Sequence, residues 1–238
     1  MDMTDVSALS RKPISLTEWL AKNWFLAFIA LYGLWVWTPV LAPLFMRLVW
    51  DGPGSAIYFV SSFFCHLLPE RSYFLFGPKV NYTLAEIQAA WIDTVNPLLL
   101  RKFTGTAAMG WKVAWSDRMI SFYGGVWLFA LLWYPLRHRL RNLPWWGLIL
   151  LLLPMFIDGT THFLSDLAGI GQGFRDSNLW LANLTNFAFA QSFYAWDALG
   201  SFNAWMRIIT GLLAGLGLVW FVFPYLDEAF STNCGSVT

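Results

Sequence analysis

Apolar residues fall in long runs along the chain, and short clusters of polar and charged residues separate these runs. A bilayer core requires about 20 mostly apolar residues for each helix that crosses it, so runs of this kind predict transmembrane helices. Four such spans are expected, at about residues 24–50, 117–136, 143–157 and 205–225.

One further apolar segment, residues 55–68, follows a turn predicted at residues 51–54, whose sequence is Asp-Gly-Pro-Gly. This segment is short for a transmembrane helix and fits a re-entrant or tilted helix equally well. The fold class expected is therefore an all-α, polytopic membrane bundle with four transmembrane helices and one short re-entrant or fifth helix.

The sequence outside these spans predicts two short helices, two terminal segments and two long loops. Ser15 and Glu18 have the spacing of a capping box that opens an interfacial helix, and Thr83 and Glu86 have the same spacing at a short amphipathic helix. The predicted parts are a polar tail and interfacial helix at 1–22, a transmembrane domain at 23–226 with long loops at 77–116 and 163–204, and a C-terminal tail at 227–238.

The distribution of basic residues predicts orientation. Arg137, Arg139 and Arg141 lie in a very short loop, and Lys22 precedes the first span, so the positive-inside rule favours four spans with both termini cytoplasmic. Lys112 and other basic residues in loop 77–116 favour the five-span alternative. In both topologies the two long loops and the polar helix ends beside them lie at one membrane face.

Composition agrees with a protein of the bilayer, and with the family resemblance given below it implies a bacterial cell membrane as the expected location. Apolar residues make up 58% of the chain and charged residues 12%, against roughly 25% charged in soluble domains. The net charge of +1 offers no basic face for nucleic acid, and two cysteines are too few for a disulfide framework. The lipid bilayer is the one partner that composition establishes.

Charged residues recur where spans begin or end at this polar face. Arg118 and Arg207 begin spans and Asp158 ends one, and His162 would share a helical surface with Asp158 if the helix continues. The candidate ligand-binding residues are Cys65, His66, Arg71, Asp117, Arg118, Tyr123, Asp158, His162 and Arg207.

Four interpretations of these residues stay open. In the simplest, Asp158 forms a structural ion pair with Arg118 or Arg207, because charges in membrane proteins are usually paired. The arginines and a histidine also suit an anionic ligand. Cys65, His66, Asp158 and His162 are acceptable metal ligands without a diagnostic spacing, and a Cys-His-Asp nucleophilic arrangement would need a geometry that sequence does not show.

Small residues mark two spans as closely packed helices. Gly211, Gly215 and Gly217 line one face of the last span, and Gly124 and Gly125 do the same at residues 117–136. In lipid, such residues let helix backbones approach one another, either within one chain or between chains.

Four ordered motifs resemble a bacterial and archaeal membrane family called domain of unknown function 2085 (DUF2085). The family's Cys-His-Gln-x-Pro-x-Arg-Ser resembles residues 65–72, and its Cys-x-Arg-Cys-x-Gly-x-Tyr-x-Gly resembles residues 116–125. Its Asp-Gly-x-Thr-Gln and Arg-x-x-Thr-Gly-x-x-x-Gly resemble residues 158–162 and 207–215.

The departures from that pattern limit what the resemblance implies. Ser116 and Met119 stand where the family has paired cysteines, so a cysteine-rich metal site does not carry over, and His162 replaces a glutamine. Residues 79–114 and 179–203 look like insertions against shorter family loops. The family implies a membrane fold and leaves the function and any cofactor unassigned.

The leading functional hypothesis is a non-enzymatic accessory protein that holds a polar or anionic ligand, or a protein partner through loops 77–116 and 163–204, at one membrane face. The alternatives are a membrane enzyme that uses Cys65, His66, Asp158 and His162, and a small-solute transporter. The sequence contains no inverted repeat and no mid-span charge, which disfavours transport. It assigns neither a cofactor nor an oligomeric state.

Overall fold

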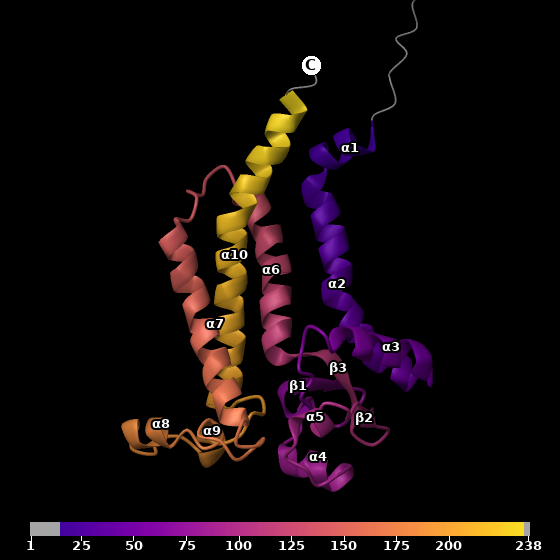
Figure 1. Ribbon diagram of the computed structural model, residues 1–238, viewed down its shortest axis with the longest axis vertical. Helices are drawn as coiled ribbons and strands as arrows, with labels where there is room; N and C mark the ends of the chain where they lie inside the picture. Colours follow the sequence, from indigo (N-terminus) through magenta and orange to yellow (C-terminus); the bar gives the residue numbers. More distant parts are fainter. Residues whose placement is uncertain (1–14, 236–238) are drawn as a thin grey trace, which may run out of the picture.

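The computed structural model describes residues 15–235, with side chains described as far as Ser231. The polar tail predicted at residues 1–14 and the last three residues of the predicted C-terminal tail lie outside the described residues. Figure 1 shows a bundle of long helices with a smaller folded region and a loop region gathered at one end.

Four long helices of the described chain are apolar enough to cross a membrane, which confirms the predicted fold class. They run alongside one another in Figure 1. Their bounds are α2 at Trp24–Arg47, α6 at Asp117–Leu136, α7 at Trp145–Asp166 and α10 at Phe202–Gly235, whose apolar part extends to Ser231.

The short apolar segment forms α3, Asp51–Ser61, which runs across the end of α2 rather than alongside it (Figure 1). Eleven residues extend about 16 Å at 1.5 Å per residue, which is too short for a bilayer core of about 30 Å. The turn predicted at residues 51–54 is wrong, because these residues form the first turn of α3. Pro53 fits there because the N–H groups of a first helical turn have no intrahelical acceptor.

The first described helix, α1 at Leu16–Lys22, begins with the predicted capping box, in which Ser15 accepts from the Glu18 backbone N–H. It contacts α10 and lies at the same end of the bundle as the last turns of that helix (Figure 1). An even number of crossings between the two helices follows from this arrangement, in agreement with four spans.

Residues 69–116 fold into a compact region, of which the sequence pattern predicted only one helix. An antiparallel sheet in the order β1-β3-β2 pairs Ser72 with Ser116 and Thr106 with Gly110. The elements are η1 at Pro69–Arg71, β1 at Ser72–Leu75, α4 at Leu84–Ala90, α5 at Pro97–Leu100, β2 at Gly105–Thr106 and β3 at Gly110–Ser116. The capping box predicted for α4 is present between Thr83 and Glu86.

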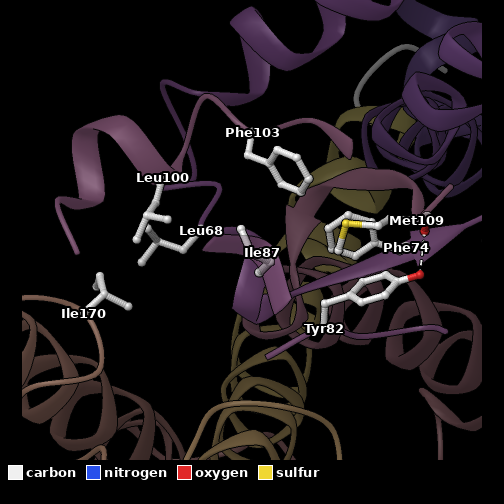
Figure 2. Packing of buried hydrophobic residues seen from close by; sticks show 8 residues of the cluster. All are labelled: Leu68, Phe74, Tyr82, Ile87, Leu100, Phe103, Met109 and Ile170. Carbon is white, nitrogen blue, oxygen red and sulfur yellow. Dashed lines mark hydrogen bonds between the residues drawn. The ribbon is translucent and has the colours of Figure 1, made fainter. Parts of the chain in front are cut away.

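A hydrophobic cluster holds this region together, and Figure 2 shows its eight residues. The Tyr82 hydroxyl donates to the carbonyl of Met109 at 2.8 Å, which satisfies the polar end of a buried ring. Ile170 enters the cluster from the distant loop after α7 and thereby joins the two polar regions. The cluster comprises Leu68, Phe74, Tyr82, Ile87, Leu100, Phe103, Met109 and Ile170.

The long loop predicted at residues 163–204 is partly helical in the structure. The third span was expected to end near residue 157, but α7 continues to Asp166 and carries Asp158 and His162 inside the helix. Two short helices follow, α8 at Leu179–Leu184 and α9 at Gln191–Tyr194, before α10 begins.

Close packing of the spans within the chain depends on specific glycines. A Cβ added at Gly211 would lie 2.3 Å from Ser121 Oγ, and one at Gly215 would lie 2.9 Å from the Val126 backbone nitrogen. Both contacts bring α10 against α6, as the small-residue pattern predicted. Gly124 takes no part in this packing within the chain, because an added Cβ there would meet nothing within 4 Å.

Candidate functional site

The ends of three spans bring their charged side chains together at the polar face. Arg118 lies in the first turn of α6, Asp158 and His162 lie near the end of α7, and Arg207 lies in the second turn of α10. All four residues are buried. The predicted i, i+4 relation holds, with His162 Nδ1 2.9 Å from the carbonyl oxygen of Asp158.

Arg207 joins α6 to the loop that precedes α10. Its Nε lies 2.9 Å and 2.8 Å from the two carboxylate oxygens of Asp117. Its Nη1 lies 2.7 Å from Asp197 Oδ1, and Nη2 donates to the backbone carbonyl of Asp197 at 2.6 Å. The sequence suggested Asp158 as a partner of Arg207, but Asp117 and Asp197 occupy its guanidinium instead.

Asp158 accepts from two arginines of different segments. Arg118 Nη2 lies 2.7 Å from Oδ2, which confirms the predicted pairing of Arg118 with Asp158. Arg175, from the loop after α7, places Nη2 2.8 Å from Oδ1. Arg175 also contacts Thr161 and Asn203, so this loop is tied to both α7 and α10.

Arg71 connects the compact region to the helical bundle. Its Nη1 and Nη2 lie 2.6 Å and 2.7 Å from the two carboxylate oxygens of Asp166, a bidentate pair at the end of α7. Its Nε lies 2.8 Å from Asp197 Oδ2. Burial alone would raise the pKa of Asp197, but Arg71 and Arg207 hold that pKa well below its usual range.

His162 lies between the two central carboxylates of this network. Nδ1 is 3.4 Å from Asp158 Oδ1, and Nε2 is 3.8 Å from Asp197 Oδ1 without a hydrogen-bond partner in the described structure. Eight charged residues surround it, four arginines and four aspartates. We call these the arginine–aspartate network: Arg71, Arg118, Arg175, Arg207, Asp117, Asp158, Asp166 and Asp197.

The network is formally neutral, because its four positive and four negative charges cancel. Each of the four guanidinium groups has at least one carboxylate within 2.8 Å. A buried charge is stabilised by such pairing, and removal of one partner would leave the other uncompensated. An incoming anion would therefore have to displace a carboxylate that is already in place.

The other predicted residues form no hydrogen bond or ion pair with this network in the described structure, although the charges of Arg71, Arg118 and Arg207 act on His66. Cys65 Sγ lies 3.4 Å from Ser116 Oγ, and the Tyr123 ring packs against Trp115 at 5.0 Å between centroids. His66 is exposed, and its Nδ1 accepts from the backbone N–H of Leu68. Within residues 15–231, no group of three or more His, Cys, Asp or Glu side chains could hold a metal ion, so the four candidate metal ligands are not assembled as one site.

A cavity of about 280 Å³ lies next to the network, between the compact region and the loop after α7. Three carboxylates border it, from Glu70, Asp176 and Asp197, and the remaining wall is mostly apolar. The lining residues are Glu70, Thr83, Leu84, Ala85, Gln88, Ile170, Gly171, Asp176, Trp196, Asp197 and Ala198.

Glu70 differs from the other acidic residues at this cavity. It is 3% exposed, and neither of its carboxylate oxygens has a hydrogen-bond partner in the described structure. The nearest cation, Arg71 Nε, is 4.0 Å away and is already paired with Asp197. Burial, together with the nearby charge of Asp197, raises the pKa of Glu70 to about 7.

Several residues of the site were missed at the sequence level. Arg175 and Asp197 lie in a stretch interpreted as loop, and Asp166 lies beyond the predicted end of its helix. Glu70 stands inside the quoted motif at residues 65–72, but nothing in the pattern indicated that it would be buried. The apolar residues Leu67, Leu68 and Pro69 that precede Glu70 were the one signal available.

Comparison with known proteins identifies relatives without a described activity. The model of the family DUF2085, described as a predicted membrane protein, matches residues 105–221. An uncharacterised protein of Methanocaldococcus jannaschii is 25% identical over 215 residues, which cover 87% of this chain and 95% of that protein. No solved structure matches the chain significantly.

The matched region has a clear relation to the site. It includes seven of the eight charged residues of the arginine–aspartate network, all except Arg71. It excludes the motif at residues 65–72 and therefore excludes Glu70. The ion pairs between spans lie within the family region, whereas the cavity is completed by residues outside it.

Proposed function

We propose that this membrane protein, which matches the DUF2085 family model over residues 105–221, acts as an accessory binding protein that holds a small organic cation at one membrane face. The cavity beside the arginine–aspartate network is the proposed binding site. The observation that carries this proposal is Glu70, a residue of the cavity wall whose two buried carboxylate oxygens have no hydrogen-bond donor within residues 15–231.

An unpartnered buried carboxylate is costly, and a ligand that donates to it removes that cost. The arginines that suggested an anionic ligand are occupied by aspartates, whereas the carboxylates at the cavity have spare acceptor capacity. Asp176 accepts one hydrogen bond, from the backbone N–H of Gly173 at 2.7 Å. The balance of charge at the cavity therefore favours a cationic ligand over an anionic one.

The apolar part of the cavity wall narrows the chemical class of the proposed ligand. Leu84, Ile170 and the indole of Trp196 line the cavity, and an aromatic face attracts a cation as well as an alkyl group. A primary ammonium on a short aliphatic chain combines a donor for Glu70 with a surface for these side chains. The proposed ligand class is a small aliphatic amine in its protonated form.

The arginine–aspartate network has a positioning role in this proposal. Arg71 directly follows Glu70 and is held by Asp166 of α7 and by Asp197 of the loop before α10. Asp197 itself lines the cavity. The network thereby supports the relative placement of the two walls, so that Glu70 is fixed before a ligand arrives.

The first experiment measures charge selection by calorimetry on the full chain in detergent micelles. The probes are n-butylammonium, n-butanol and n-butyrate, which share a short alkyl chain and differ in charge. Saturable binding of n-butylammonium alone supports the proposal. Saturable binding of n-butyrate alone, or equal behaviour of the three probes, contradicts it.

A matched pair of variants locates the binding. Glu70→Gln removes the carboxylate charge from the cavity and should abolish the butylammonium signal. Asp93→Asn removes an exposed acidic charge of the same region that does not line the cavity, and it should leave the signal intact. Loss of binding in both variants, or in neither, would reject Glu70 as the recognition group.

We also propose that the cavity lies on the outer side of the membrane, with both termini cytoplasmic. The support is the short basic loop at Arg137–Arg141, which lies at the opposite end of the bundle from the cavity. Cys65 and Cys234 would be replaced by serine, and single cysteines introduced by Asp93→Cys or His138→Cys. A membrane-impermeant maleimide applied to intact cells should label only the first, and the reverse result would invert the orientation.

A further inference from the structure

A second hollow, separate from the Glu70 cavity, lies between α3 and α5 and has a volume of about 700 Å³. We call it the α3–α5 groove. It combines two basic side chains and several hydroxyl groups with exposed aromatic rings, and none of its lining residues is acidic. These residues are Ser55, Tyr58, Phe59, Ser62, Phe63, Leu67, Leu98, Arg101, Lys102 and Thr104.

The position of α3 places this groove at the membrane boundary. The helix runs across the end of the spanning helix α2, at the level where the compact region begins (Figure 1). Phe59 and Phe63 are 65% and 70% exposed, and Trp50 just before α3 is 58% exposed. An exposed tryptophan at a helix end, such as Trp50, is typical of the headgroup level of a bilayer, and the exposed phenylalanine rings offer apolar surface beside it.

The opposite side of α3 faces an apolar hollow. This hollow has a volume of about 440 Å³ and lies between α3 and the middle of α2. Because α2 is a membrane span, the wall of this hollow lies at the depth of lipid acyl chains. The residues that line it are Leu31, Leu34, Trp35, Thr38, Pro39, Ala56, Ile57, Val60 and Ser61.

The basic groups of the groove are held in place but not neutralised. Arg101 Nη2 donates to the carbonyl of Ser62 at 2.9 Å, which fixes the guanidinium against the end of α3. The buried Lys112 donates to the carbonyls of Leu67 and Arg101 at 2.6 Å and 2.9 Å, and so supports the groove from behind. Within residues 15–231, neither Arg101 nor the exposed Lys102 forms an ion pair with a carboxylate.

From this arrangement we propose that the α3–α5 groove binds the phosphate headgroup of an anionic phospholipid. Arg101 and Lys102 contact the headgroup, since guanidinium and ammonium groups are the usual partners of phosphate. The acyl chains pass over Phe59 and Val60 toward the apolar hollow beside α2. This site is independent of the Glu70 cavity and of the ligand proposed there.

The test compares two lipids on the full chain. Protein in nanodiscs of phosphatidylcholine with a minor fraction of phosphatidylglycerol is released into detergent, and native mass spectrometry counts the retained lipids. The wild-type chain should retain phosphatidylglycerol in preference to phosphatidylcholine. Equal retention of the two lipids would overturn the proposal.

Matched variants separate the groove from general surface charge. Lys102→Gln should lower the preference about fivefold, and Arg101→Gln with Lys102→Gln should lower it by a similar factor again. Lys79→Gln removes an exposed lysine of the same region that is not at the groove, and it should leave the preference unchanged. An unchanged preference in the double variant, or an equal loss in Lys79→Gln, would contradict the proposal.

Two further measurements exclude trivial outcomes. Millimolar inorganic phosphate should not release the retained phosphatidylglycerol, and complete release would assign the groove to a free phosphate ion instead. The double variant should keep the thermal unfolding midpoint of the wild-type chain, because Arg101 and Lys102 lie at an open groove. If Arg101→Gln unfolds the chain, Lys102→Gln alone decides the outcome, since the Lys102 side chain is exposed.

Discussion

The guanidinium of Arg207 on α10 contacts both carboxylate oxygens of Asp117 at the start of α6, with Nε 2.9 Å from Oδ1 and 2.8 Å from Oδ2. The pair crosslinks two spans at the point where Gly211 lets their backbones approach. Both side chains are at most 4% exposed, so water contributes little to their solvation. The ion pair therefore depends on both partners being present.

Asp117→Asn should destabilise the chain by about 3–5 kcal/mol, because it leaves part of the buried Arg207 charge uncompensated. Unfolding in detergent, followed by the thermal midpoint, measures this effect. Lys79→Met provides the control, since Lys79 forms an exposed pair with Glu86 and its removal should leave the midpoint unchanged. An equally small effect of both variants would contradict a structural role for the network.

Gly215→Ala should destabilise the α6–α10 contact by about 1–3 kcal/mol, because the new Cβ would lie 2.9 Å from the backbone nitrogen of Val126. Gly124→Ala is the matched control on the same helix pair, and it should be tolerated because an added Cβ there meets nothing within 4 Å. Thermal unfolding of the two variants gives the comparison. If Gly124→Ala proved the more harmful, the packing of α6 against α10 described above would be incorrect.

Glu70→Gln should make the chain more stable at alkaline pH and leave its stability unchanged in acid. The folded-state pKa of Glu70, about 7, exceeds its ordinary value of 4.5, so the folded state binds more protons between these pH values. Stability contributed by the protonated carboxyl is present below about pH 4.5 and is lost as pH rises to about 7. The difference between variant and wild type should reach at most about 3 kcal/mol at about pH 8.

The measurement for this prediction is the unfolding midpoint of both proteins across that pH range. Arg71, Asp166, Asp197 and Lys112 also act electrostatically on Glu70, and they are present in both proteins, so the comparison isolates the Glu70 carboxyl. A wild-type chain that is more stable than the variant at about pH 8 would show that the carboxylate has a partner in the folded state.

The hydrophobic pattern predicted the spans well because lipid imposes it directly on the sequence. A helix in a bilayer must satisfy its own backbone and expose apolar side chains, so spans such as α2 and α10 appear as apolar runs. The end of α7 was missed because Asp158, Thr161 and His162 interrupt the run. Asp158 is paired with Arg118 and Arg175, and Thr161 accepts from Arg175, so the partners come from other segments, which hydropathy does not report.

The candidate site was predicted in part, for a related reason. Arg118 and Asp158 stand out at the ends of apolar runs, and their pairing was expected from the cost of burying single charges. Arg175 and Asp197 come from a stretch without periodicity, so their positions depend on tertiary contacts. The β1–β3 pairing was missed because it joins residues about 40 positions apart by short strands, and such pairing leaves only a weak local signal.

Proton release on ligand binding is the most direct test of Glu70 as the group that pairs with an ammonium ligand. At about pH 6 most Glu70 side chains are protonated in the free protein, so an ammonium that pairs with the carboxylate must displace a proton. Calorimetric titration of n-butylammonium in two buffers of different ionisation enthalpy gives the number of protons released. We expect release of most of one proton at about pH 6, and little at about pH 9. Binding without proton release at the lower pH, or with the same release in Glu70→Gln, would contradict it.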